Sequence, residues 1–150
     1  SGPARLHLNH YLTPKNSVGI ASLGQITSYD HNVDGYAIQR AAMYMMEWFR
    51  SAPTKLLIRI SDGLPCYQDC GQSNRYGSAQ GRKHVQKVCK TANANGIKVI
   101  SLGIDCGELQ PASMEEMYGA KNWALLKNAM QLPLVLSNLI TQPIKRDLHL

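Results

Sequence analysis

The sequence predicts an α/β fold, with an open, mostly parallel β-sheet and flanking helices. Two short, mostly apolar segments, 55–61 (KLLIRIS) and 97–105 (IKVISLGID), have the composition of strands buried on both faces of a parallel sheet. A segment with helical periodicity precedes each of them, over 35–50 and from about Ala79. Strand and helix therefore alternate along the chain, which favours parallel pairing through right-handed crossovers.

The N-terminal segment has a less regular pattern. Residues 1–3, Ser-Gly-Pro, are typical of a cloning remnant or of a cut within a longer chain, and we leave them out of the fold prediction. Residues 5–12 (RLHLNHYL) alternate apolar and polar side chains, which indicates a half-buried strand. For the next segment two readings stay open, because Thr13 and Pro14 suit a helix start whereas the following Val-Gly-Ile run suits a strand.

The central helix and strand are predicted from clearer patterns. Between residues 35 and 50, apolar side chains recur every three or four positions, which predicts an amphipathic helix that Pro53 ends. The strand 55–61 follows and leads into a long polar loop. A second helix is expected from about Ala79, and Asn95-Gly96 is a typical pair at a helix C-terminus.

After the strand 97–105, three shorter elements are predicted. Residues 111–119 (PASMEEMYG) suit a short helix, with Ser113 and Glu116 at the spacing of a capping box. Residues 122–126 (NWALL) read as a brief extended segment, and 131–140 (QLPLVLSNLI) as a final helix. The chain thus continues the alternation of strand and helix to its last predicted helix.

Composition narrows the class of protein. A chain of 150 residues with 44% hydrophobic content fits one globular domain. We find neither a long uncharged apolar window nor a secretory leader, so we expect a cytoplasmic protein without a membrane segment. The net charge of +6 is dispersed, without a basic run that interleaves aromatic residues, and does not predict specific nucleic-acid binding.

The four cysteines, Cys66, Cys70, Cys89 and Cys106, contain only one closely spaced pair. A structural zinc site of the common kind has a second close pair of ligands, and a domain of this length does not need disulfides for stability. We expect reduced thiols, with a zinc site and a disulfide as the alternatives.

An acidic residue directly follows the first predicted central strand. Asp62 lies between Ser61 and Gly63, and the glycine permits a sharp turn there. In open α/β sheets, ligands bind beyond the carboxyl ends of the strands. Mg²⁺ prefers oxygen ligands and keeps several waters, so a few carboxylates and hydroxyls from separate loops suffice to hold it. Asp62 and Ser61 are therefore candidate metal ligands.

A second acidic segment lies immediately before the first helix. Asn32 and Asp34 occupy this position, and their side-chain oxygens suit the same cation. Asp34 has an alternative role, because an aspartate at the N-cap of a helix accepts hydrogen bonds from free backbone N–H groups and contributes about 1 kcal/mol. Ligation and capping both stay open for Asp34.

These segments resemble a known family. The sequences HNVDGYAIQRAA (31–42), KLLIRISDGLP (55–65) and IKVISLGID (97–105) resemble the von Willebrand factor A (vWA) domain. The similarity is to the branch found in cobaltochelatase cobalt-insertion subunits and nitric oxide reductase activation proteins, and covers roughly residues 30–140. It implies a Rossmann-like sheet and a metal-ion-dependent adhesion site (MIDAS). In that site, Asp34 matches the second metal-binding loop and Asp62 the third.

The chain departs from the family at the first metal-binding loop. The Asp-x-Ser-x-Ser motif of that loop, which in the family ends the central strand, is not found in the sequence. We therefore expect a partial vWA-like domain over 4–142 that lacks the first central strand, followed by a tail at 143–150. Its affinity for Mg²⁺ should be poor. An open strand edge should pair with a complementary segment, self-associate, or be closed by an altered strand arrangement.

The resemblance implies binding rather than catalysis. A bound Mg²⁺ with one open coordination position would accept an acidic side chain from a partner, which in this branch is commonly a ring-forming AAA+ ATPase of the chelatase or MoxR type. The implied role is metal insertion or complex remodelling. The alternative is a structural or mobile-element protein that retains the fold with an incomplete metal site. We do not predict an enzyme, because the sequence has neither a G-x-S-x-G elbow nor a phosphate-binding loop.

Overall fold

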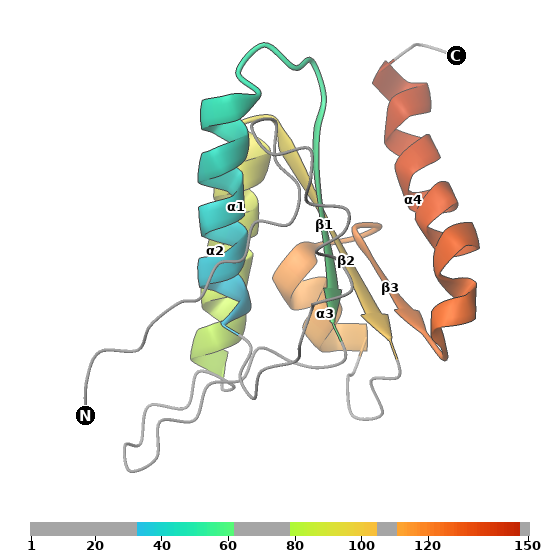
Figure 1. The fold of residues 1–150 in the computed structure, drawn as a ribbon. Coiled ribbons are helices and arrows are strands. Elements are labelled where there is room, and N and C mark those ends of the chain that lie inside the picture. The colour runs from blue at the N-terminus through green and yellow to red at the C-terminus, as the bar shows by residue number, and fades with distance from the viewer. Residues whose placement is uncertain (1–32, 62–78, 105–110, 148–150) are drawn as a thin grey trace, which may run out of the picture.

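The computed structural model describes residues 33–61, 79–104 and 111–147 (Figure 1). Helices and strands alternate, so the predicted α/β class is confirmed. The predicted elements at 5–12 and 13–26, and the polar loop after β1, lie outside the described residues. The elements in chain order are α1 (Asp34–Trp48), β1 (Lys55–Ser61), α2 (Ala79–Ala94), β2 (Ile97–Ile104), α3 (Pro111–Tyr118), β3 (Trp123–Leu126), the short 3₁₀ helix η2 (Ala129–Gln131) and α4 (Leu132–Asp147).

The described strands form one parallel sheet with the order β1-β2-β3. Ile58 of β1 lies opposite Ile100 of β2, and Leu102 of β2 lies opposite Ala124 of β3. Helices α2 and α3 lie between successive strands in the chain, as parallel pairing requires, because the chain must return to the start of the sheet before each new strand. The predicted parallel arrangement is therefore present.

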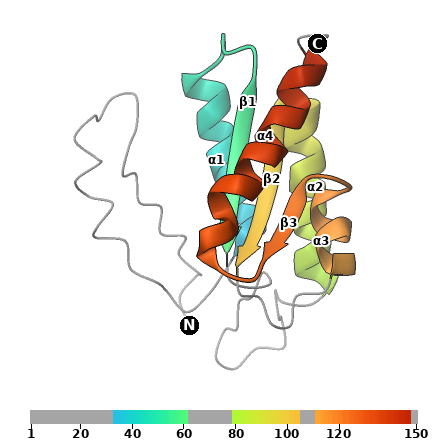
Figure 2. The same ribbon diagram turned by 90° about the vertical axis from the view of Figure 1, so that its right-hand side faces the viewer.

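The sheet lies between helices. Helices α1 and α2 run side by side over one face, and α4 lies across the other (Figures 1 and 2). Both α1 and α2 run opposite to the strands, so their N-termini lie at the same end of the sheet as the carboxyl ends of β1 and β2 (Figure 1). We call this the carboxyl end of the sheet, and it is where the sequence places its candidate ligands.

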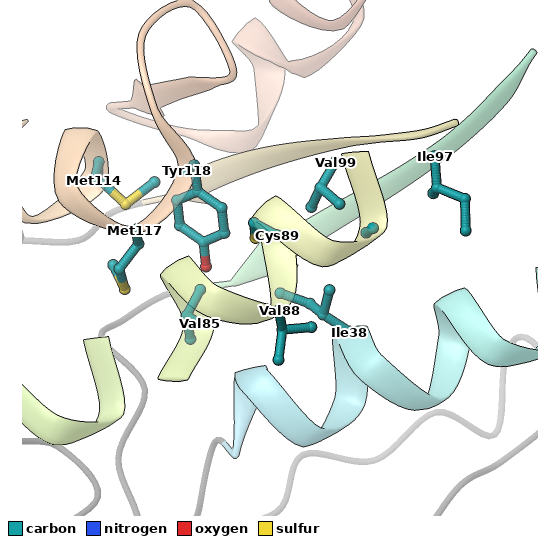
Figure 3. Close-up of a cluster of buried hydrophobic side chains, with 10 residues drawn as sticks. Ile38, Val85, Val88, Cys89, Ile97, Val99, Met114, Met117 and Tyr118 are labelled. Atoms are coloured by element: carbon teal, nitrogen blue, oxygen red, sulfur yellow. The ribbon is translucent and has the colours of Figure 1, made fainter. Parts of the chain in front are cut away.

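The hydrophobic core lies between the sheet and the layer formed by α1, α2 and α3. Val85, Val88 and Cys89 of α2 lie between Ile38 of α1 and the side chains of α3 (Figure 3). Complete burial of one such aliphatic side chain contributes about 1.5–3 kcal/mol. The buried cluster on this face consists of Ile38, Val85, Val88, Cys89, Ala92, Ile97, Val99, Met114, Met117 and Tyr118.

The helix ends follow simple backbone rules. Helix α2 ends at the predicted Asn95-Gly96 pair, where Gly96 has a φ of +74°. A residue with a Cβ rarely adopts this left-handed conformation, so a glycine here permits the tight connection into β2. None of the described helices combines the length and the apolar character needed to cross a membrane.

The expectation that β1 is buried on both faces is wrong. Ile58 is 37% exposed and Ile60 is 51% exposed. Successive side chains of a strand point to opposite faces of the sheet, so both isoleucines lie on the face opposite Arg59, which is buried. Among the described elements α4 contacts mainly β3 and η2, and Ile58 and Ile60 stay partly exposed on this face. By contrast, β2 is buried along nearly its whole length.

The capping box predicted at Ser113 and Glu116 is also wrong. Helix α3 begins at Pro111, so Ser113 lies within the helix rather than at its N-cap. Proline is favourable in the first turn because its missing N–H has no helical partner there. The carboxylate of Glu116 instead accepts a hydrogen bond of 2.8 Å from Arg82 Nε, which connects α3 to α2.

Candidate functional site

Asp34 is the first residue of α1 and lies at the carboxyl end of the sheet. It is only 7% exposed. The N-cap residue is Val33, which makes no side-chain capping bond, so the capping role considered for Asp34 is wrong. An N-cap residue precedes the first residue of its helix, whereas Asp34 is itself the first residue of α1. Its carboxylate is bonded to Arg59 of β1 instead of to the backbone of its own helix.

Arg59 of β1 is the partner of Asp34. Its Nη2 donates a hydrogen bond of 2.5 Å to Asp34 Oδ2, and both side chains are buried. Its Nη1 donates a hydrogen bond of 3.3 Å to the hydroxyl of Ser101, which is fully buried on β2. The guanidinium carbon also lies 5.9 Å from the centre of the Tyr118 ring. Arg59 thus connects α1, two strands and α3 within the core.

The electrostatics of this cluster follow from burial. Removing a charged group from water costs several kcal/mol, and an opposite charge with good hydrogen-bond geometry offsets that cost. Burial raises the pKa of Asp34 above its ordinary value of 3.8, and the charge and hydrogen bond of Arg59 act in the opposite direction. Loss of Arg59 would therefore leave a buried carboxylate without its compensating charge.

Two other titratable groups lie against this pair, and neither is activated. Burial raises the pKa of the Cys89 thiol to about 12, although the charge of Arg59 opposes the shift. Burial also raises the pKa of the Tyr118 hydroxyl, again against the effect of Arg59. Nucleophilic cysteines have lowered pKa values, so Cys89 has the character of a structural core residue.

The structure describes two of the four predicted metal ligands. Asp34 lies at the start of α1, and Ser61 is the half-buried last residue of β1, two positions after the arginine that holds Asp34. Both elements reach the carboxyl end of the sheet (Figure 1). Asp62 and Asn32 lie outside the described residues, and each is adjacent in sequence to a described segment. The two described residues of the predicted site thus belong to elements that meet at the same end of the sheet.

The described residues alone are a poor ligand set for Mg²⁺. One oxygen of Asp34 is bonded to Arg59, and a guanidinium at that distance repels a divalent cation. Within residues 33–61, 79–104 and 111–147, no cluster of three or more His, Cys, Asp or Glu side chains is placed to hold a metal ion. A Mg²⁺ at this end of the sheet would need the oxygens of Asp62 and Asn32, together with water.

The sequence prediction missed Arg59, although the sequence contained a signal. Arg59 is the one charged residue inside the otherwise apolar part of KLLIRIS, and its position two residues from Leu57 places it on the face that α1 covers. A charge on the buried face of a strand requires an opposite charge nearby. An acidic residue on an adjacent helix was therefore to be expected, and Asp34 meets that requirement.

Comparison of the chain with protein-family models, with curated proteins and with solved structures gave no match. The resemblance to the vWA domain therefore rests only on the sequence motifs around Asp34 and Asp62. The observed parallel sheet is consistent with a Rossmann-like fold. That architecture is shared by many families with unrelated functions, so it does not by itself assign a function.

Proposed function

We propose that this chain is a divalent-cation-dependent protein-interaction module of the vWA type that binds partners at the carboxyl end of its sheet. The observation that supports this most is the convergence of α1 and β1. The N-terminus of α1, with Asp34, and the last residue of β1, Ser61, lie at the end of a parallel sheet where ligands commonly bind. Asp62 continues directly from this strand in the sequence.

In this proposal Ser61, Asp62 and Asn32 supply oxygen ligands for Mg²⁺. The bound cation would offer an open coordination position to a carboxylate of the partner, because hard cations favour charged oxygen ligands. Asp34 contributes negative charge close to the site and is kept in place by Arg59. Its direct coordination of the cation would require a change in the hydrogen bond to Arg59.

The partner class follows from the resemblance alone. In the related branch, vWA domains act with ring-forming AAA+ ATPases of the chelatase or MoxR type. We propose an acidic segment of such an ATPase as the partner, in metal insertion or in the remodelling of a protein complex.

The Arg59–Asp34 pair favours a second candidate. A guanidinium already balances the carboxylate of Asp34, so this part of the fold is charge-compensated without a metal ion. A structural or mobile-element protein that keeps the fold and has lost the cation site would have this feature. The two candidates differ in whether Mg²⁺ binds at Asp62.

Calorimetric titration of the 150-residue chain with Mg²⁺ separates the candidates. We expect weak, saturable binding that is lost in Asp62→Asn. Glu47→Gln is the matched control, because it removes one negative charge from an exposed position on α1 outside the proposed ligand set. Binding that is unchanged in Asp62→Asn, or an absence of binding in the unmodified chain, would exclude the cation-dependent function and leave the structural alternative.

A further inference from the structure

A groove of about 780 Å³ lies between α1 and α2, and it is separate from the Arg59 cluster. The two helices run side by side on the same face of the sheet (Figure 1). The C-terminal end of α2 and the start of β2 complete its lining. It is lined by Gln39, Ala42, Met43, Met46, Glu47 and Arg50 from α1 and the loop after it, His84, Lys87, Val88, Thr91, Ala92 and Asn95 from α2 and its C-terminus, and Ile97 of β2.

The floor of the groove is apolar. Val88 and Ala92 of α2 are buried beneath it, while Met43 is 55% exposed and Met46 is 37% exposed on the α1 side. Methionine side chains are flexible and polarizable, so they adapt to apolar side chains of different shapes. Exposed apolar side chains that line a groove with a polar rim are typical of a binding surface.

The dimensions suit one helix. The lining residues within α1 run from Gln39 to Glu47, which corresponds to about 12 Å at the rise of an α-helix. That length holds roughly two helical turns. Near the N-terminal ends of both helices, the rings of Tyr36 and His84 make an edge-to-face contact with their centroids 4.6 Å apart. This contact connects α1 to α2 at that end of the groove.

Basic residues outnumber acidic ones in the lining of the groove. Helix α2 has four basic residues and no acidic residue: Arg82, which is paired with Glu116, and Lys83, Lys87 and Lys90, which are all exposed. Of these residues only Lys87 lines the groove, and Arg50, which follows α1, is the other basic residue of the lining. Burial and the charge of Lys87 lower the pKa of His84, which disfavours its charged form. Glu47 is the one acidic residue in the lining.

From this apolar floor and the excess of basic over acidic residues in the lining, we infer that the groove binds an acidic amphipathic helix of a partner protein. Apolar residues of that helix, spaced at i, i+3 or i+4, and i+7, would pack on Met43 and Met46, as in other helix-in-groove complexes. Its carboxylates would lie against Lys87 and Arg50. This interaction requires no cation, so it is independent of the Mg²⁺ site proposed above.

The test uses the 150-residue chain and two fluorescein-labelled helical peptides in buffer with EDTA. Both peptides carry leucines at the helical spacing given above; one has glutamates and the other lysines at the flanking positions. Fluorescence anisotropy should show saturable binding of the glutamate peptide that weakens as salt is added. We expect the lysine peptide to bind at least roughly tenfold more weakly, because like charges then face each other.

Matched variants locate the binding site. Lys87→Glu should weaken binding of the glutamate peptide much more than Lys127→Glu, which makes the same charge change at an exposed position outside the groove. Met43→Ser should weaken binding, whereas Met130→Ser, at an 88% exposed residue of η2, should leave it unchanged. Circular dichroism checks that each variant is folded.

Three results would overturn the inference. They are equal binding of the two peptides, no binding of the glutamate peptide, or equal effects of the Lys87 and Lys127 variants. Analytical ultracentrifugation tests whether a second copy of the chain fills the groove. A dimer that Met43→Ser dissociates would assign the groove to that second copy and would also overturn the inference. Because EDTA is present throughout, failure here is distinguishable from failure of the cation-dependent function.

Discussion

Asp34 and Arg59 form a buried ion pair that joins the start of α1 to the interior of β1. The two residues are 25 positions apart in the sequence, and the carboxylate of one accepts a hydrogen bond of 2.5 Å from the guanidinium of the other. Arg59 also bonds to Ser101, so the pair holds the α1 layer in register with two adjacent strands. The acidic residue predicted to bind a cation thus has a structural partner inside the fold.

We expect Arg59→Met to reduce the free energy of unfolding by about 3–5 kcal/mol, because it leaves a buried carboxylate without a compensating charge. Urea denaturation followed by circular dichroism measures the change. In a double-mutant cycle with Asp34→Ala, the double variant should lose less stability than the sum of the single losses. Additivity within about 0.5 kcal/mol would show that the two residues are not coupled.

The stability deficit of Arg59→Met should depend on pH. Arg59 lowers the pKa of Asp34 against the effect of burial, so its removal raises the pKa of the folded-state carboxyl further above 3.8. The folded variant then binds a proton more tightly than its unfolded form does. Its stability relative to the wild type should improve as the pH falls through the raised pKa, and worsen as the pH rises through it. A deficit that is constant with pH would contradict this assignment.

Much of the fold could be predicted from the sequence because each element has a strong local pattern. The strand 55–61 and the helix that starts at Ala79 lie where apolar periodicity indicates them. The features that the sequence did not predict depend on contacts between segments that are distant in the sequence. Whether Ile58 is covered depends on which segments reach its face of the sheet, and the choice of Arg59 as partner for Asp34 depends on packing across 25 positions. Local periodicity contains neither kind of information.

The candidate site could be predicted only in part, for the same reason. Asp34 begins α1 at the carboxyl end of the sheet, but a sequence motif does not specify what its carboxylate is bonded to. The capping prediction for Asp34 differed from the structure by a single residue, since the cap is Val33. One position decides whether a side chain faces its own helix backbone or a neighbouring strand.

The exposed isoleucines of β1 should promote self-association. Among the described strands β1 has a single neighbour, β2, so its other edge and the face with Ile58 and Ile60 offer a template for another chain. Sedimentation velocity should show concentration-dependent association that Ile60→Lys reduces, because a charge opposes pairing at an edge. Leu134→Lys, at a 70% exposed residue of α4, is the control and should change it less. A chain that is monomeric at all concentrations would contradict this prediction.

Cys89 should be unreactive in the folded protein. Its thiol is buried among core residues, and its pKa is raised from an ordinary 9.0 to about 12. Iodoacetamide labelling followed by mass spectrometry should therefore modify Cys89 only when urea unfolds the chain.

The raised pKa of Cys89 also predicts a loss of stability in alkali. The unfolded thiol ionises near pH 9.0 while the folded thiol stays neutral up to about 12, so this contribution is complete below pH 9.0 and is lost as the pH rises through that interval. Cys89→Val should weaken the pH dependence of the free energy of unfolding in this range. An unchanged pH dependence would show that the thiol does not contribute.

The central claim is that the carboxyl end of the sheet binds a divalent cation, and paramagnetic NMR with Mn²⁺ tests it most directly. Mn²⁺ replaces Mg²⁺ at oxygen-rich sites and broadens the amide signals of nearby residues even when it binds weakly. We predict selective broadening of Ser61, Val33 and Asp34, which Mg²⁺ competes away and Asp62→Asn abolishes. Broadening that is confined to other parts of the chain, or that persists in Asp62→Asn, would contradict the claim.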